Sequence, residues 1–390
     1  MKVLIMNEKL IEGGAEIYSL KLKEIMEKDN EVYLMTFDNN FSENIKKLNN
    51  NKNLINIEVN NKLKFFNKNF FNILLYFKIR KQINKINPDK IILNNIFCSP
   101  ITQIKALKGY EPYQVIHDYS VVCPKSTCLK HNLEICNGYK NEKCMKECLY
   151  HNSKIVMFLK LVLTKKMEKL RKKYIKKTIS PSEKLNTYLK DYGYITSSIN
   201  NPMEMEEASQ INIENKNDII YVGAINDNKG IFKFLEAFNK IESNMNLKII
   251  GKPSSKEDEE KLNFLISKND RISYLGFVPN NQAKQMIKES KFMVVPSLWM
   301  ENYPTTVLEA MMMKTFVIGS NRGGIPEMLA DNRGITFNIL NAENIVEVLN
   351  KIYNLSEEEY NKIINNAYNY VKENNSFDKY YERLKKELNI

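Results

Sequence analysis

Two glutamates, Glu301 and Glu309, lie eight positions apart beside an expected helix. Residues 292–296 form an apolar run typical of a buried strand, and Pro304 suits the first turn of a helix. We therefore expect Glu301 in the loop and Glu309 in the second turn of the helix. A carboxylate such as Glu309 can accept two hydrogen bonds from the hydroxyls of a ribose. The spacing alone is a weak signal, because two surface glutamates would show it as well.

The start of the same helix offers a second kind of chemistry. Thr305 and Thr306 stand in its first turn, where backbone N–H groups have no partner within the helix. These N–H groups and the positive end of the helix dipole attract a phosphate.

Cysteines gather in one short region. Five of the six lie between residues 123 and 148, and all three histidines of the chain fall in the same neighbourhood. This grouping suggests a structural zinc site, although the spacing matches no standard zinc finger closely. The alternative is a set of buried and surface thiols without a metal. The members are Cys123, Cys128, Cys136, Cys144 and Cys148, with His117, His131 and His151.

Apolar runs that predict strands alternate with stretches of helical spacing along the chain. This alternation predicts parallel sheets with right-handed crossovers. A polar, Asn-rich stretch at residues 197–218 fits an interdomain linker. We predict two doubly wound α/β domains with a ligand in the cleft at the strand carboxyl ends. Strands are expected at residues 2–6, 31–36, 90–93, 113–116, 178–180, 218–223, 247–250, 272–277, 292–296 and 316–319.

The charge balance favours an anionic partner. The 390 residues include 58 Lys and Arg against 46 Asp and Glu, a net charge of +12. Nucleic acid, a membrane surface or a phosphorylated ligand would each suit this charge. No apolar run is long enough for a membrane-spanning helix, and we expect no secretory signal at the start of the chain.

Residues 153–177 predict a basic amphipathic helix. One interpretation is a domain helix with a solvated lysine face, and the other is contact with an anionic membrane surface. The apolar residues at helical spacing are Ile155, Phe158, Leu159, Val162 and Leu163.

Several longer segments resemble the retaining glycosyltransferases of family four, which have the GT-B fold. They are PSLWMENYPTTVLEA, GSNRGGIPEML, YVGAINDNKGIFKFLEAF and ISYLGFVP, and they cover most of the second half of the chain. GGAE and HDYSVVCP in the first half match more loosely. The resemblance implies an α/β GT-B fold with two Rossmann-like domains facing a central cleft.

The resemblance also implies roles for residues of the second half, where a nucleoside-diphosphate sugar would bind. Glu309 would hold the ribose hydroxyls, and Glu301 and Asn302 would face the transferred sugar. Lys229 would neutralise the departing diphosphate, helped by the helix start at Thr305 and Thr306.

In the first half, the resemblance assigns Gly13 and Gly14 to the loop near the diphosphate. Glycine lets the backbone approach without a side chain in the way. His117, at a strand end, would hydrogen-bond the donor sugar. No catalytic metal is expected, because Lys229 and helix dipoles would supply the positive charge. The chain departs from the family at Ala224, where a basic residue is usual, and this bears on donor choice.

Similar Cys-rich segments occur in some family members. On that comparison we expect Cys123, Cys136, Cys144 and Cys148 to hold a structural zinc or to shape the acceptor site. The predicted domains are residues 1–200, an acceptor-binding domain with the Cys-rich insert at about 117–151, and residues 201–370, a donor-binding domain. Residues 371–390 should form a helix that packs back on the first domain.

Together these features predict a retaining, metal-independent glycosyltransferase that extends a glycan or lipid-linked glycan. We expect it in the cytoplasm, with peripheral contact to the inner face of an anionic membrane. One alternative is a sugar-nucleotide epimerase on the same fold. Another is a non-catalytic zinc- or nucleic-acid-binding protein, but no basic groove with stacking aromatics is readable, so we expect no nucleic acid.

Overall fold

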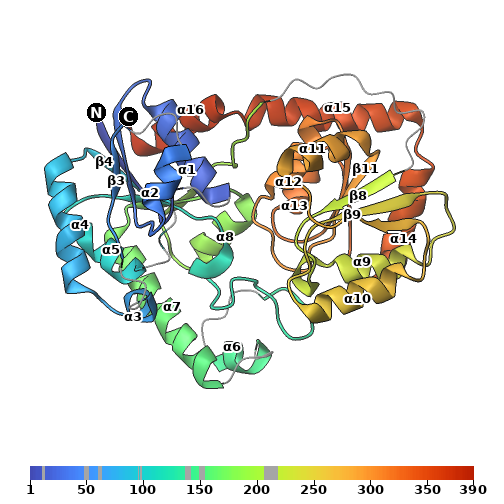
Figure 1. The fold of residues 1–390 in the computed structure, drawn as a ribbon, viewed down its shortest axis with the longest axis horizontal. Helices are drawn as coiled ribbons and strands as arrows, with labels where there is room; N and C mark the ends of the chain where they lie inside the picture. Colours follow the sequence, from blue (N-terminus) through green and yellow to red (C-terminus); the bar gives the residue numbers. More distant parts are fainter. Residues whose placement is uncertain are drawn as a thin grey trace. The chain divides into compact units, whose positions relative to one another are not determined.

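A computed structural model describes residues 1–10, 14–47, 52–59, 64–94, 96, 99–136, 142–148, 154–205 and 218–390. The chain forms two compact units, each with its own parallel sheet (Figure 1). Unit 1 consists of Met1–Ser126, Asn137–Pro202 and Phe377–Ile390, and unit 2 of Thr127–Cys136 and Met203–Ser376.

The sheet of unit 1 has seven strands in the order β3-β2-β1-β4-β5-β6-β7, and every described pairing is parallel. The order reverses between β1 and β4, so the loops that follow these two strands diverge to opposite faces and leave room for a ligand. The strands are β1 (Lys2–Met6), β2 (Glu31–Thr36), β3 (Leu54–Asn56), β4 (Lys90–Leu93), β5 (Tyr113–Val115), β6 (Lys177–Ser180) and β7 (Thr196–Ser198).

Helices cover both faces of this sheet, because successive side chains of a buried strand point to opposite sides. In β1, Val3 and Ile5 pack in one cluster with α1 (Gly14–Met26) and α16 (Phe377–Leu388). Leu4 and Met6 pack in a second cluster with α4 (Ile73–Ile86), α5 (Pro100–Ala106) and α7 (Lys154–Tyr174). The other helices of unit 1 are α2 (Phe41–Asn44), η1 (Ile45–Lys47), α3 (Lys64–Asn69), η3 (Tyr119–Val121), α6 (Glu142–Glu147) and α8 (Glu183–Asp191).

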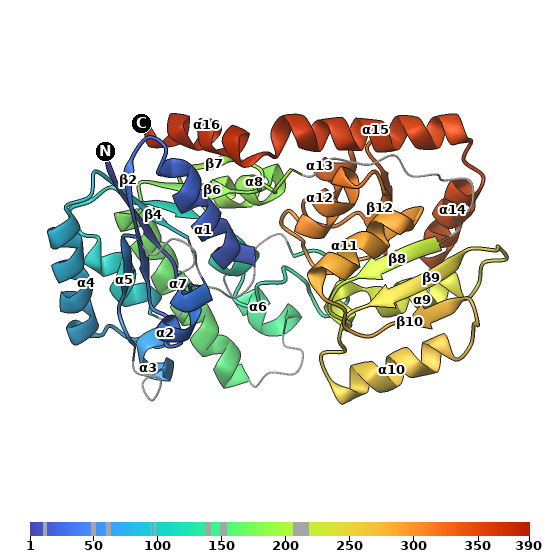
Figure 2. The ribbon, with the colours of Figure 1, turned by 45° about the horizontal axis from the view of Figure 1, so that its top comes forward.

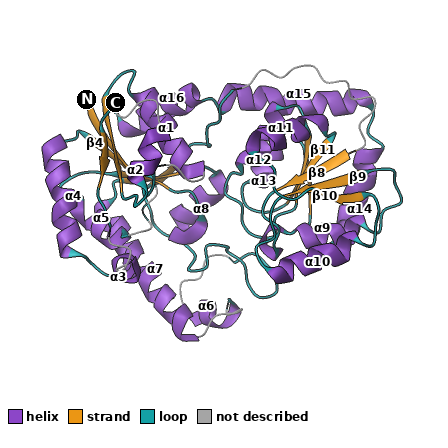
Figure 3. Cartoon of the chain, in the orientation of Figure 1, coloured by secondary structure: helices purple, strands orange, loops and turns teal. Residues whose placement is uncertain are grey.

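The sheet of unit 2 has six parallel strands in the order β10-β9-β8-β11-β12-β13, and its order reverses between β8 and β11. Figure 3 shows helices on both sides of it. The strands are β8 (Asp218–Val222), β9 (Asn246–Ile250), β10 (Ile272–Tyr274), β11 (Phe292–Val295), β12 (Phe316–Ser320) and β13 (Ile335–Phe337). The helices are η4 (Asp227–Lys229), α9 (Ile231–Phe238), α10 (Lys256–Ile266), α11 (Asn280–Glu289), α12 (Thr305–Met312), α13 (Ile325–Leu329), α14 (Ala342–Tyr353) and α15 (Glu357–Asn374).

A short hairpin from the Cys-rich region, residues 127–136, belongs to unit 2 and not to the N-terminal domain in which the sequence analysis places it. Leu129 pairs antiparallel with Ile135, and the Cys136 N–H donates to the Cys128 carbonyl at 2.8 Å. Leu129 is buried in the core of unit 2, and Leu133 packs against that core. Burial of these leucines holds the hairpin on unit 2.

The last helix, α16, belongs to unit 1, and the chain passes from α15 to α16 at residues 375–376. α16 packs on α1, where the hydroxyls of Tyr18 and Tyr380 are hydrogen-bonded and their rings meet edge to face. The long helical stretch thus changes unit near residue 376, a few residues later than expected.

The ten predicted strands are confirmed, to within three residues at each end. The predicted basic helix is α7, but its buried stripe differs from the expected one. Met157, Leu161 and Met167 face the protein, whereas Ile155 and Phe158 are exposed. Among the described residues, none of the helices has the length and apolar character that crossing a bilayer needs.

Candidate active site

The two loops that follow β8 and β11 form the centre of the candidate site in unit 2. They leave the sheet where its strand order reverses, the usual ligand position in such sheets. The loop after β8 contains Lys229 at the end of η4, and the loop after β11 contains Glu301. Asn226 caps η4, accepting a hydrogen bond from the Lys229 N–H at 3.1 Å.

Close backbone contact fixes these loops against each other. Gly230 has a φ of +70°, and a Cβ there would lie 1.9 Å from the carbonyl oxygen of Pro296. The N–H groups of Leu298 and Trp299 both donate to the Asn228 carbonyl, at 2.9 and 3.1 Å. Since only glycine permits this approach, the residue after Lys229 determines where the lysine stands relative to the β11 loop.

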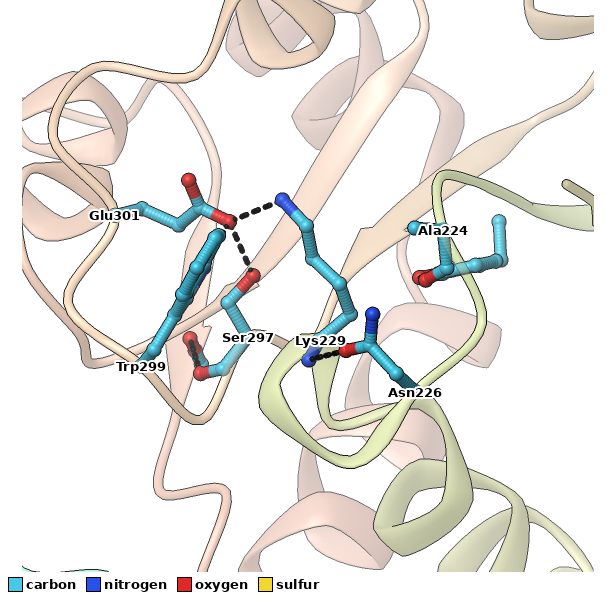
Figure 4. A network of polar contacts seen from close by, with 8 residues as sticks. Ala224, Asn226, Lys229, Ser297, Trp299 and Glu301 are labelled. Carbon is cyan, nitrogen blue, oxygen red and sulfur yellow. Dashed lines mark hydrogen bonds and ion pairs between the residues drawn. The ribbon is translucent and has the colours of Figure 1, made fainter. Parts of the chain in front are cut away.

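Three donors meet one carboxylate oxygen of Glu301 (Figure 4). Its Oε1 accepts from Lys229 Nζ at 2.7 Å, from the Ser297 hydroxyl at 2.8 Å and from the Trp299 indole N–H at 2.7 Å. The Lys229 ammonium also lies 4.9 Å from the centre of the Trp299 ring. The sequence predicted Lys229 and Glu301 as site residues with separate roles. It did not predict their contact or the part that Ser297 and Trp299 play in orienting Glu301.

The backbone of Glu301 is fixed as well. Its carbonyl accepts the Gly324 N–H at 2.8 Å, from the loop after β12. Gly323 in that loop has a φ of +60°, and a Cβ there would lie 1.8 Å from the same carbonyl oxygen. Glu301 is thus held through its side chain by the β8 and β11 loops and through its backbone by the β12 loop.

The second predicted glutamate lies where the sequence placed it, in the second turn of α12. Glu309 is half-buried, and Asn302 is buried in the loop before the helix. α12 begins at Thr305 without a side-chain cap, and Thr306 follows in the first turn. Backbone N–H groups in the first turn of such a helix can bind an anion.

In unit 1, a buried polar network lies where the strand order reverses. Asn7 follows β1, Asn94 follows β4 and His117 follows β5. The Asn94 side chain donates to Asn7 Oδ1 at 3.2 Å and to the Ser19 hydroxyl, while its Oδ1 meets His117 Nε2. Sequence reasoning found His117 but missed Asn7, Asn94 and Ser19, which are brought together only by the sheet.

His117 is uncharged near neutral pH. Burial lowers its pKa to about 4, and the neighbouring Asp118 carboxylate opposes that shift. The ring of Tyr18 packs edge-on against the imidazole at 5.5 Å. A neutral imidazole can donate one hydrogen bond and accept another, which suits a contact with a sugar hydroxyl. Of the two predicted glycines in this unit, Gly14 begins α1 and Gly13 lies outside the described residues.

The Cys-rich region shows no metal site among the described residues. Cys123, Cys144 and Cys148 belong to unit 1 and Cys136 to unit 2, and all four are buried. Within the described ranges, no three His, Cys, Asp or Glu side chains gather as metal ligands. His151 lies outside the described residues, and the expected zinc clip stays a prediction.

Comparison with known proteins agrees with the geometry of unit 2. Residues 204–370 match the family model of glycosyl transferases group 1. An uncharacterised glycosyltransferase of Methanocaldococcus jannaschii is 29% identical over 164 residues, 41% of each chain. A lipopolysaccharide 1,2-N-acetylglucosaminetransferase of Salmonella typhimurium is 25% identical over 194 residues, 46% of this chain and 50% of the relative. The chain thus spans half or less of the length of these relatives.

The fold matches over the whole chain. HepE of Anabaena, solved in complex with UDP, has a TM-score of 0.74 and 14% identity, and the match covers 100% of both chains. The two sheets and their helices thus form the GT-B fold predicted from the sequence.

The contact between Lys229 and Glu301 can be tested by a double-mutant cycle. The two side chains are 29% and 11% exposed, so Lys229→Ala and Glu301→Gln should be non-additive by about 0.5–1 kcal/mol in free energy of unfolding. Urea unfolding of both single variants and the double variant measures this term. Lys248→Ala, which breaks a separate ion pair with Asp218, should add independently to Glu301→Gln. Full additivity of the Lys229 and Glu301 changes would contradict the contact.

The zinc clip stays a prediction that metal analysis can test. Protein purified without chelators should contain about one zinc per chain, and Cys144→Ser should lose it. Cys98→Ser, outside the cluster, is the matched control. Wild-type protein without metal and with reactive thiols at the four predicted positions would contradict the clip.

Proposed function

We propose that this chain is a retaining glycosyltransferase of family four that uses a nucleoside-diphosphate sugar. The observation that carries the proposal is the Lys229–Glu301 contact at the strand carboxyl ends of unit 2, inside the segment that matches glycosyl transferases group 1. A lysine and a carboxylate held together at a ligand position can bind an anionic leaving group and a sugar hydroxyl side by side.

In the proposed donor complex, each group has one task. Glu309 holds the ribose hydroxyls, and Glu301 and Asn302 hold the transferred sugar. Lys229 turns toward the diphosphate, with Thr305 and Thr306 adding backbone N–H donors. Lys229 is paired with Glu301 in the structure. In the proposal, the ammonium stays near Glu301 and also contacts the diphosphate when the donor binds.

The chemical step needs only these charges. The bond between the sugar C1 and the diphosphate oxygen breaks, and the acceptor hydroxyl oxygen bonds to C1 on the same face. The hydroxyl proton passes to the departing diphosphate, which carries the bonding electron pair. Lys229 and the α12 dipole stabilise the developing negative charge, so no catalytic metal is required in the proposal.

Unit 1 contributes the proposed acceptor domain and one donor contact. Neutral His117, held by Asn94, is proposed to hydrogen-bond the donor sugar. Gly13 and Gly14 are proposed to let the first loop of unit 1 approach the diphosphate. The acceptor is proposed to be a glycan or lipid-linked glycan, in cell-surface polysaccharide or glycolipid synthesis. The Salmonella relative is named for transfer to lipopolysaccharide, which supports this choice.

A peripheral membrane contact, on the inner face from the cytoplasm, is part of the same proposal. The first half of α7 leaves five apolar side chains exposed, the α7 patch: Ile155, Val156, Phe158, Leu159 and Val162. A second exposed group, the α3–α4 patch, consists of Phe66, Phe70, Ile73, Leu74 and Phe77. Both α3 and α7 pack on α5, and Figures 1 and 2 draw them side by side. Groups of exposed apolar side chains of this kind are typical of a membrane or protein contact.

Basic side chains continue from the α7 patch along the helix. Lys165, Lys169 and Lys172 line a pocket of about 430 Å³ together with Glu168 and Tyr192. Lysines near an anionic bilayer attract it by about 1 kcal/mol each. An apolar end followed by a basic pocket suits insertion of α7 side chains below anionic headgroups.

The reaction can be tested with a panel of nucleoside-diphosphate sugars. We expect one donor to raise the melting temperature, and UDP-sugars are tried first because HepE binds UDP. Glu309→Ala should weaken the binding of that donor about 10-fold or more, because two hydrogen bonds are lost. The exposed Glu289→Ala should leave the affinity unchanged. Transfer should continue in excess EDTA and keep the anomeric configuration.

Other outcomes decide against parts of this proposal. Activity lost at once in EDTA and restored by Mg²⁺ would exclude metal independence, and an inverted product would exclude family four. Conversion of the donor sugar without any acceptor would favour the epimerase alternative.

Membrane contact can be tested by sedimentation with vesicles. We expect binding to vesicles rich in anionic lipid, weaker binding in high salt, and little binding to neutral vesicles. Phe158→Ser with Leu159→Ser should reduce the bound fraction several-fold. Phe264→Ser, an equally exposed phenylalanine in unit 2, is the matched control. Equal binding by all variants would contradict a role for the α7 patch.

A further inference from the structure

Arg322, in the loop after β12, is a buried cation for which the described residues provide no counter-ion. Only 4% of the accessible surface of Arg322 is exposed. Among the described residues, its one hydrogen-bond acceptor is the Leu133 carbonyl, which meets Nη2 at 3.3 Å. Its Nε–H is buried and has no acceptor in the part of the chain that the structure describes. Burial lowers the pKa of Arg322, but a guanidinium stays protonated in proteins.

A second buried arginine of unit 2 shows how such a group is ordinarily satisfied. Arg333, 8% exposed, pairs with the Asp331 carboxylate at 2.9 Å. It also donates to the carbonyls of Met328 and Glu327, at 2.8 and 2.7 Å. Buried charges are normally paired in this way, because an unpaired one is costly. Arg322 therefore has the features of a binding residue, and Arg333 those of a structural one.

Arg322 stands beside the candidate site. The next two residues, Gly323 and Gly324, contact the Glu301 backbone directly. The start of the same loop is tied to the β11 loop, since the Ser320 hydroxyl donates to the Ser297 carbonyl at 2.7 Å. The loop that contains Arg322 is thus anchored to the β11 loop, which presents both Ser297 and Glu301.

The hairpin 127–136 holds the guanidinium from the other side. Its Thr127 carbonyl accepts the Met300 N–H at 3.3 Å, next to Glu301, and its Leu133 carbonyl accepts from Arg322. The hairpin is itself fixed by burial of Leu129 and by its internal backbone hydrogen bonds. It therefore orients Arg322 without neutralising the charge.

We propose that Arg322 binds an oxyanion of the nucleotide sugar, either a diphosphate oxygen or a carboxylate on the transferred sugar. This inference rests on the proposed function for the identity of the ligand. The shared chemistry is an anionic oxygen that accepts the buried Nε–H and offsets the charge. Arg322 would thereby help determine which donor the enzyme accepts.

The test compares Arg322→Met with Arg333→Met in the full chain. Thermal unfolding and calorimetric titration are measured with UDP, UDP-glucose, UDP-glucuronate and inorganic pyrophosphate. Arg322→Met should weaken binding of the anion at least about 10-fold and leave the ligand-free melting temperature unchanged or higher. Arg333→Met should lower the melting temperature and leave affinity unchanged. Arg322→Lys, which keeps the charge, should restore part of the affinity.

Comparing the four ligands distinguishes a diphosphate oxyanion from a sugar carboxylate. Weaker binding of UDP and pyrophosphate by Arg322→Met would identify the diphosphate, and weaker binding of UDP-glucuronate alone would identify a sugar carboxylate. Binding of pyrophosphate through Arg322 without binding of any nucleotide would leave the anion site standing and remove the proposed function. Wild-type affinity in Arg322→Met, or no binding of any of the four by the wild type, would overturn the inference. So would a loss of folding stability equal to that of Arg333→Met with no specific loss of affinity.

Discussion

One carboxylate oxygen of Glu301 accepts hydrogen bonds from an ammonium, a hydroxyl and an indole N–H. This convergence depends on backbone contacts that leave no space for a side chain. Gly230 brings the lysine loop against the end of β11, and Gly323 brings the β12 loop against Glu301 itself. These loops therefore need glycine at two positions where main-chain atoms approach closely, in addition to the side chains that form the site. Rigid support of this kind lets an ion pair form at a defined position although both partners lie on loops.

The two units have different polar groups at the same topological position. In each, polar groups gather where the strand order reverses. Unit 2 uses opposite charges, Lys229 and Glu301, whereas unit 1 uses neutral amides, a hydroxyl and an imidazole whose pKa is lowered to about 4. The neutral network centred on Asn94 avoids the cost of burying a charge and still fixes the position of His117. Each unit thus has its own polar site, charged in unit 2 and neutral in unit 1.

The sequence predicted the central strands well and the edges poorly, for a physical reason. Buried strands such as β1 and β11 are continuous apolar runs, whereas the edge strands β3 and β7 have only three residues each, and β7 has no apolar side chain. Glu301 and Lys229 could be found because segment resemblance marks them, whereas Asn7, Asn94 and Ser19 meet only through the sheet. The buried stripe of α7 could not be read, because its first half is apolar on every side. The cysteine spacing of residues 123–148 drew attention to metal chemistry and gave no sign that the hairpin 127–136 packs on unit 2.

The path of the chain through the two units has a consequence for how the protein is made. Unit 1 takes residues from three separate stretches, the last being α16, and the core around α1 includes Tyr380, Tyr381 and Leu384. Domains normally fold in turn as they leave the ribosome, with the N-terminal one first. Here the N-terminal unit lacks part of its core until residues 377–388 have been translated, whereas unit 2 needs nothing beyond residue 376. The order of synthesis and the order of completion are thus reversed, and the nascent first unit exposes the apolar face of α1 while the second is being translated.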